Sequence, residues 1–168
     1  MAAKKSIQIL DKAQIKQKID RIAYQILEDC FDEKEIIIAG IASRGYVFAE
    51  RLAKVIGQIS KIKCTLVEIT LDKDSNNLVA STDIAIDKCK NKTIILVDDV
   101  LNSGRTLLYG LAVFLNIPTK KIRTAVLIDR SHKLFPIATD YAGYTISTVS
   151  QEHISVVFDK NKEAVYLS

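Results

Sequence analysis

Hydrophobic and polar positions follow two different periods along this chain. Apolar residues recur at steps of three and four from Ile15 to Cys30, which predicts an amphipathic helix with Asp11 as its N-cap. An unbroken apolar run from Ile36 to Ala42 is typical of a strand buried on both faces of a parallel sheet. Helical spacing returns between Tyr46 and Ile56, so the chain is predicted to begin as helix, strand and helix.

The alternation of predicted helices and strands continues in the rest of the chain. A helix is predicted at Thr106–Ile117, ended by Pro118, and the polar stretch Asp72–Thr82 is predicted to be a mobile loop. Three apolar segments read as full strands: Ile62–Leu71, Thr93–Val97 and Arg123–Asp129. Shorter strand-like segments lie near the end of the chain: Tyr141–Ser147, Ile154–Phe158 and Ala164–Leu167.

This order of elements favours an α/β fold with an open, mostly parallel twisted sheet flanked by helices. The short C-terminal strands break the alternation and are predicted to form a small hood. A length of 168 residues suits one domain. We expect its core over about residues 11–135 and its hood over about residues 136–168, with the N-terminal helix packing nearby.

Composition narrows the class of protein. No apolar run approaches the roughly 18 residues that cross a bilayer, and no signal-peptide pattern follows Met1, so we expect a cytoplasmic protein without a membrane partner. Cys30, Cys64 and Cys89 lack metal-ligand spacing and are interpreted as ordinary reduced thiols. A net charge of +4 suits phosphate-rich ligands and is compatible with nucleic acid, without diagnosing either.

The residues best suited to bind a ligand lie where one predicted strand ends. Four aliphatic residues lead into Asp98 and Asp99, and a short polar turn, Asn102–Thr106, opens the next helix. Such a turn offers backbone N–H groups to a phosphate, while the carboxylates can take sugar hydroxyls or a metal. The turn is neither a Walker A loop nor a dinucleotide fingerprint. Taken alone, the acidic pair could equally be a solvated strand end with a helix-capping aspartate.

Carboxyl ends of parallel strands meet at one edge of a sheet, so three turns should converge there: 43–45, 98–106 and 129–133. The turn Ser43–Gly45, taken alone, is an ordinary strand-to-helix connection. His132 and His153 lack an evident acid–base partner in the sequence and are interpreted as surface residues.

The run Asp98–Thr106 resembles the signature with which type I phosphoribosyltransferases bind 5-phosphoribosyl 1-diphosphate (PRPP). The resemblance spans nearly the whole chain and is greatest to the bacterial pyrimidine-operon attenuators that also have uracil phosphoribosyltransferase activity. Other segments carry it too: Gly40–Gly45, Val67–Leu71, Ala125–His132 and Ala138–Gly143.

The resemblance implies roles for individual residues. Asp98 and Asp99 would hold the ribose hydroxyls and, together with Arg44, would be the catalytic residues. Mg²⁺ would arrive on PRPP and could also contact the two aspartates. The implied sites comprise three sets: for PRPP, Asp98, Asp99, Val100, Leu101, Asn102, Ser103, Gly104, Arg105 and Thr106; for pyrophosphate, Ser43, Arg44 and Gly45; for the base, Arg130, Tyr141 and Ala142. Tyr141 could instead be a strand aromatic that packs the hood.

The implied reaction is transfer of ribose 5-phosphate from PRPP to a nucleobase, with release of pyrophosphate, in nucleotide salvage. Uracil is favoured by the resemblance alone, and a purine base stays open. The expected partners are PRPP, a nucleobase or nucleoside monophosphate, and a second copy in a homodimer. Two alternatives are an RNA-binding regulator of pyrimidine genes that uses the nucleotide site as a sensor, and a receiver-like signalling domain. RNA would need the basic helix face of Lys12, Lys16, Lys18 and Arg21, which could also be simply solvated.

Overall fold

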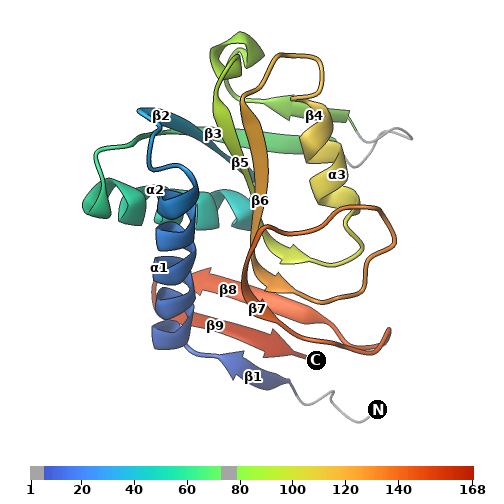
Figure 1. The fold of residues 1–168 in the computed structure, drawn as a ribbon. Helices are drawn as coiled ribbons and strands as arrows, with labels where there is room; N and C mark the ends of the chain where they lie inside the picture. Colours follow the sequence, from blue (N-terminus) through green and yellow to red (C-terminus); the bar gives the residue numbers. More distant parts are fainter. Residues whose placement is uncertain (1–5, 73–78) are drawn as a thin grey trace.

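A six-stranded sheet with helices on both faces forms the body of the protein (Figure 1). The structure, a computed structural model, describes residues 6–72 and 79–168. The elements in chain order are β1 Ile7–Leu10, α1 Lys12–Asp29, β2 Glu35–Ile41, α2 Arg44–Ile59, β3 Lys63–Asp72, β4 Val79–Thr82, a 3₁₀ turn Ile86–Cys89, β5 Thr93–Leu101, α3 Arg105–Ala112, β6 Lys121–Asp129, β7 Tyr141–Thr145, β8 Ile154–Asp159 and β9 Lys162–Leu167.

The large sheet has the order β4-β3-β2-β5-β6-β7, and its strands are parallel except for the antiparallel pair of β3 and β4. Its central strands β2, β5 and β6 are almost wholly buried, which is why their sequences are continuous apolar runs. The predicted open, mostly parallel α/β sheet is confirmed.

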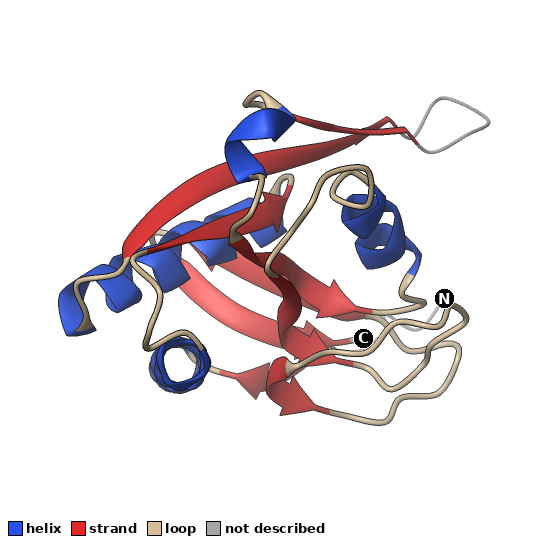
Figure 2. Ribbon diagram, turned by 45° about the horizontal axis from the view of Figure 1, so that its top comes forward, coloured by secondary structure: helices blue, strands red, loops and turns tan. Residues whose placement is uncertain are grey.

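The two faces of the sheet are covered by different helices (Figure 2). In β2, Ile36 and Ile38 pack with the apolar sides of α1 and α2, whereas Ile37 and Ala39 pack with α3. This alternation follows from the two-residue period of a strand. Asp11 caps α1 as predicted: its carboxylate accepts a hydrogen bond from the Gln14 amide (2.8 Å), and the side-chain oxygen of Gln14 accepts one from the Asp11 amide (2.9 Å).

The hood differs from its prediction. Its β8 and β9 form a separate three-stranded sheet with β1, an N-terminal strand that the sequence analysis missed. In contrast, β7 belongs to the large sheet, where it pairs in parallel with β6. The small sheet lies beyond the carboxyl ends of β5 and β6, with β8 next to β5 (Figure 1). The hood is thus built from both ends of the described chain.

Three other boundaries differ. Residues 79–82, predicted as loop, form β4 because they complete a ladder with residues 69–72 of β3; residues 73–78 of that predicted loop lie outside the described residues. Strand β5 runs four residues beyond Val97, since Val100 and Leu101 still pair with β6. Helix α3 stops at Ala112, and turns rather than helix lead to Ile117.

No helix in the described part of the chain is long and apolar enough to cross a membrane. The three cysteines are unpaired thiols, as predicted. Burial raises the pKa of the Cys64 thiol to about 11 and also raises the pKa of Cys30 and Cys89, which makes all three poor nucleophiles at neutral pH.

Candidate functional site

A cleft of about 520 Å³ opens at the carboxyl edge of the large sheet. It collects residues from all three predicted turns and from the hood. Its lining comprises Ile41, Ala42, Ser43, Arg44, Leu71, Asp98, Asp99, Val100, Asn102, Thr106, Arg130, His153 and Ile154. The expectation that turns distant in sequence meet at this edge is therefore met for the turns after β2, β5 and β6.

The acidic pair lies inside β5 rather than after it. Asp98 is buried, at 8% exposure, and Asp99 is half-buried, yet both reach the cleft. The Asp99 amide donates a hydrogen bond to Oδ1 of Asp98 (2.9 Å), which holds that carboxylate against its own backbone. Two acids this close repel unless hydroxyl donors or a cation satisfy them, so the cleft is prepared for such a ligand.

The start of α2 packs directly on the acidic strand through Gly45. A Cβ atom at Gly45 would lie 2.9 Å from Oδ1 of Asp98 and 2.9 Å from the carbonyl oxygen of Val97. Only glycine allows this approach. Although Ser43–Gly45 was predicted as a turn, Arg44 is the first residue of α2, exposed toward the cleft, and the Ala42–Ser43 peptide bond is cis.

A smaller hollow of about 90 Å³ adjoins the cleft and is shaped by the loop between β5 and α3. Gly104 has a φ of +87°, a left-handed conformation that glycine adopts without strain. The carbonyl oxygen of Ser103 accepts hydrogen bonds from the amides of Leu134 (2.8 Å) and Phe135 (3.1 Å), so the 130–137 segment holds the loop in place. Residues lining the hollow are Asp98, Val100, Leu101, Asn102, Ser103, Gly104, Thr106 and Leu107.

The hollow lies at the N-terminus of α3, where the first backbone N–H groups have no partner within the helix. These groups, the positive end of the helix dipole and the hydroxyls of Ser103 and Thr106 together form an anion-binding arrangement. Its size suits one phosphate group. The predicted phosphate loop and the predicted acidic pair are thus parts of one continuous site, because Asp98, Val100, Asn102 and Thr106 line both spaces.

The three residues predicted for the base separate into two groups. Arg130, only 4% exposed, lies at the cleft beside the loop. Tyr141 and Ala142 do not line the cleft; Tyr141 is the first residue of β7 and pairs with Ala125 in the middle of β6, away from the carboxyl edge.

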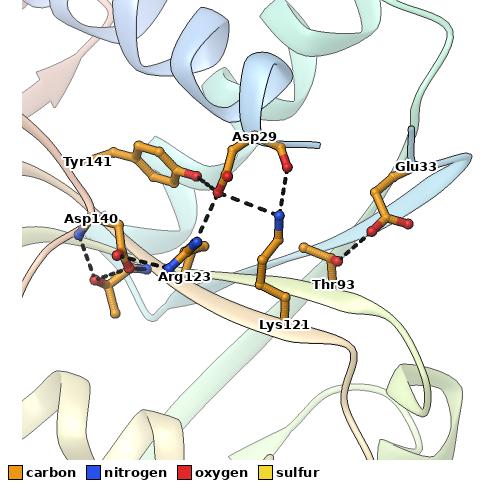
Figure 3. A network of polar contacts seen from close by, with 8 residues as sticks. Asp29, Glu33, Thr93, Lys121, Arg123, Asp140 and Tyr141 are labelled. Carbon is orange, nitrogen blue, oxygen red and sulfur yellow. Dashed lines mark hydrogen bonds and ion pairs between the residues drawn. The ribbon is translucent and has the colours of Figure 1, made fainter. Parts of the chain in front are cut away.

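Tyr141 instead belongs to a polar network that fastens the end of α1 to the sheet (Figure 3). Its hydroxyl donates a hydrogen bond to Asp29 (2.5 Å), which also accepts one from Arg123 (3.0 Å). The hydrogen bond from Tyr141 and the nearby cations lower the pKa of Asp29, while burial and the Asp29 carboxylate raise the pKa of Tyr141. The Ala142 carbonyl accepts a hydrogen bond from Arg21 (3.0 Å), so it too has a structural partner.

Sequence reasoning missed five residues of the cleft: Ile41, Ala42, Leu71, His153 and Ile154. His153 was interpreted as a surface residue; it is exposed, but its exposed side borders the cleft. Its backbone exchanges two hydrogen bonds with Ser168 (2.7 and 2.9 Å), which places the start of β8 at this edge. No local signal marks it, because only the pairing of the hood strands brings it there.

Comparison with known proteins places this geometry in context. The sequence profile of the phosphoribosyl transferase domain matches residues 6–161. The chain is 40% identical to "Bifunctional protein PyrR" of Clostridium acetobutylicum, over 88% of each chain. It is 35% identical to the protein of the same name from Alkaliphilus metalliredigens, over 97% of this chain and 95% of the other.

Solved structures agree on the fold. A hypoxanthine-guanine phosphoribosyltransferase from Bacillus anthracis superposes with a TM-score of 0.72 at 24% identity, over 85% of this chain and 84% of the other. The hypoxanthine phosphoribosyltransferase of Trypanosoma cruzi superposes with a TM-score of 0.77 at 14% identity, over 95% and 94%.

Proposed function

Because the chain belongs to the phosphoribosyl transferase domain family, we propose that it transfers ribose 5-phosphate from PRPP to a nucleobase and releases pyrophosphate. The observation that carries this proposal is the continuity of the site. A phosphate-sized hollow and the cleft that holds the acidic pair share four lining residues, so the phosphate and the pentose of one ligand can occupy the two spaces together. Few ligands other than a phosphorylated sugar would use both a phosphate site and a neighbouring pair of carboxylates.

The strand order distributes the substrate along the edge of the sheet. Strand β5 is central, so Asp98 and Asp99 hold the ribose hydroxyls while the loop that follows them binds the 5′-phosphate. Arg44 comes from beside β2 and faces the diphosphate. Arg130, after β6, lies on the opposite side of β5, together with the hood. The base therefore belongs on the side of β6.

In this arrangement the bond from C1 of the ribose to the diphosphate oxygen breaks while a ring nitrogen of the base bonds to C1, and the proton of that nitrogen passes to water. The transition state has oxocarbenium character, so the carboxylates of the acidic pair stabilise the positive charge that develops on the sugar. Arg44 stabilises the charge on the departing diphosphate. The main contribution of the protein is to position the reacting atoms.

Magnesium fits this site as part of the substrate. Within residues 6–72 and 79–168, no group of three or more His, Cys, Asp or Glu side chains is arranged to hold a metal ion. Asp98 and Asp99 alone are too few donors for a resident ion, whereas a diphosphate supplies the missing oxygens. Bound Mg²⁺ would neutralise part of the diphosphate charge.

We assign the base to the region bordered by Arg130, His153 and Ile154, in place of Tyr141 and Ala142. Apolar Ile154 offers a packing surface, and Arg130 offers donors to a carbonyl oxygen. Uracil is the favoured acceptor because of the resemblance to the pyrimidine-operon attenuators. Hypoxanthine and guanine are the competing acceptors, since structural neighbours carry those names.

A pyrophosphate-release assay with PRPP, Mg²⁺ and each of uracil, hypoxanthine, guanine and xanthine tests the proposal. We expect release with uracil and a drop of at least about 100-fold in kcat/KM for Asp99→Asn, given the typical cost of losing one transition-state contact. Asp32→Asn is the matched control, because Asp32 is an exposed carboxylate before β2, at the other edge of the sheet. Full activity of Asp99→Asn, or no release with any base, contradicts the proposal.

The word "bifunctional" in the names of the relatives suggests a second function, and the resemblance to the pyrimidine-operon attenuators makes RNA-dependent regulation the candidate. Of the predicted basic helix face, Lys12 and Lys16 are exposed and line a groove together with Lys54 of α2, whereas Arg21 is held by the carbonyls of Ala142 and Gly143. We expect salt-sensitive binding to a pyrimidine-operon leader RNA that weakens when Lys12, Lys16 and Lys54 are replaced by Gln. Unchanged RNA binding in this variant would contradict a role for this surface.

We also propose that the protein forms a homodimer, which sedimentation equilibrium would test.

A further inference from the structure

A buried arginine joins the phosphate loop to the hood. Arg130 is 4% exposed, and each nitrogen of its guanidinium donates one hydrogen bond, one to the loop after β5 and two to the segment after β7. Nη1 donates to Oδ1 of Asn102 (2.8 Å), in the loop after β5, and Nε donates to Oγ1 of Thr148 (2.7 Å), after β7. Nη2 donates to the carbonyl oxygen of Val149 (3.3 Å).

All three acceptors are neutral. Among the ion pairs of the described residues none involves Arg130, although Asp129 precedes it directly. The Asp129 carboxylate is engaged elsewhere, by the amide of Ser131 (2.8 Å) and the hydroxyl of Thr139 (3.2 Å). Neutral acceptors orient a guanidinium but do not cancel its charge, and a buried charge without a counter-charge is costly. A negatively polarised oxygen of a bound ligand would offset this free-energy cost.

The guanidinium has donors left for such an oxygen. It carries five N–H groups, and the three hydrogen bonds that hold it use one on each nitrogen. One N–H group on each terminal nitrogen is left over by these contacts. Because Arg130 lines the large cleft, the ligand oxygen would approach from there.

The position of Arg130 indicates which part of the ligand it would contact. Arg130 does not line the small phosphate hollow, and it lies on the opposite side of β5 from Arg44, so neither the 5′-phosphate nor the diphosphate is its natural partner. Its hydroxyl and carbonyl acceptors Thr148 and Val149 come from the segment that leads into β8, and His153 and Ile154 of the same region border the cleft. A carbonyl oxygen of the acceptor base fits both its place and its charge.

We propose that Asn102 and Thr148 are positioning residues that orient Arg130 toward a carbonyl oxygen of the acceptor base. This inference rests on the proposed function. It gives the exposed side chain of Asn102 a role distinct from that of the loop around it: the loop backbone binds the phosphate, whereas the Asn102 amide oxygen acts on the base through Arg130. The hydrogen bonds thereby connect the part of the site that holds the donor with the part that selects the acceptor.

The test separates base affinity from phosphate affinity. In Asn102→Ala and in Thr148→Val, each of which removes one acceptor of Arg130, we expect KM for the base to rise about tenfold, the effect of losing one charge-assisted hydrogen bond. In Thr148→Val, whose side chain lines neither the cleft nor the phosphate hollow, the Kd of ribose 5-phosphate, measured by calorimetry, should change by less than about twofold. Thr148→Ser keeps the hydroxyl and should restore the wild-type KM for the base.

The double variant Asn102→Ala/Thr148→Val should raise KM for the base by less than the product of the single effects, since both act through one guanidinium. A wild-type KM for the base in both single variants overturns the inference. So does a parallel rise in the Kd of ribose 5-phosphate in Thr148→Val, or a failure of Thr148→Ser to restore the KM.

Failure of the proposed function looks different. If the wild-type protein releases no pyrophosphate with any base, that function is contradicted, and the inference is then judged by binding alone. Calorimetry with uridine 5′-monophosphate and ribose 5-phosphate supplies this readout. A selective loss of nucleotide affinity in Thr148→Val supports the inference, while equal or absent effects on the two ligands, or no nucleotide binding by the wild type, overturn it.

Discussion

Replacing Gly104 by alanine tests whether the left-handed turn after β5 creates the phosphate site. The substitution adds one methyl group and perturbs two things. It imposes a side chain on a residue with a φ of +87°, and it places the new Cβ 2.5 Å from Cγ2 of Ile137. Carbon atoms in contact normally stand about 3.5–4.0 Å apart, so the loop or Ile137 must move by about 1 Å.

The expected magnitude has two parts. A left-handed conformation costs a residue with a Cβ about 1–2 kcal/mol, and inserting a methyl group into packed surroundings costs about 1–3 kcal/mol. The loop can escape this strain of about 2–5 kcal/mol by leaving the phosphate-binding conformation, which the ligand must then restore. A cost of 2 kcal/mol corresponds to about 30-fold in affinity, so we expect the Kd of ribose 5-phosphate to rise at least about 30-fold.

Ile137→Ala separates the two parts because it removes the atom that the new methyl group meets. In the double variant Gly104→Ala/Ile137→Ala we expect partial recovery, leaving about 5- to 30-fold from the backbone conformation alone. Calorimetric titration of ribose 5-phosphate measures all four proteins of the cycle. Wild-type affinity in Gly104→Ala would refute the claim that this turn shapes the site, and a double variant as weak as the single one would refute the steric part.

Further predictions concern the neighbouring strands and helices. Gly45→Ala should lower kcat/KM more than tenfold because its Cβ would press on Asp98, while Gly57→Ala, with nothing within 4 Å of its Cβ, should retain activity and stabilise α2 by about 0.5–1 kcal/mol. Hydrogen bonds from Lys92 and Thr65 lower the pKa of Glu35 from 4.5 to about 2, so Glu35→Gln should lose about 1 kcal/mol of stability at pH 7, after allowance for solvent screening. Because the folded-state pKa is the lower one, this loss should be complete above pH 4.5 and vanish as the pH falls toward 2, as followed by urea unfolding. Tyr141→Phe should lower the free energy of unfolding by about 1 kcal/mol and leave KM for the base within about twofold, since the hydroxyl serves Asp29; a large rise in KM would return Tyr141 to the base site.

Local patterns predicted the parts of this fold whose cause is local. The central strands are apolar because both of their faces are covered, and α1 begins at Asp11 because a capping box satisfies its first amides. Strand β1 could not be predicted in the same way. Its four residues, Ile-Gln-Ile-Leu, are too few to establish a strand pattern, and its partner β9 lies at the other end of the chain, so its own sequence does not reveal the pairing that makes it a strand.

The site likewise has one part whose cause is local in sequence and one part that depends on distant segments. The part proposed to hold the ribose 5-phosphate is continuous in sequence: a strand, two acids and a glycine turn follow one another, so the chemistry of Asp98–Thr106 can be predicted before the structure is known. The half that faces the acceptor is assembled from distant segments. Arg130 follows β6, Thr148 follows β7, and His153 reaches the cleft only because β8 pairs with β9.

This division explains why Tyr141 was assigned to the base. An aromatic residue at the start of a C-terminal strand has the right chemistry for stacking, but the register of β7 against β6 decides which edge of the sheet it faces. That register puts Tyr141 opposite Ala125, where its hydroxyl meets Asp29 at the end of α1. Register is a property of the paired strands and not of either sequence alone. Selectivity for the acceptor base therefore has to be inferred from the contacts around Arg130, whereas binding of the sugar phosphate follows from the order of residues along β5.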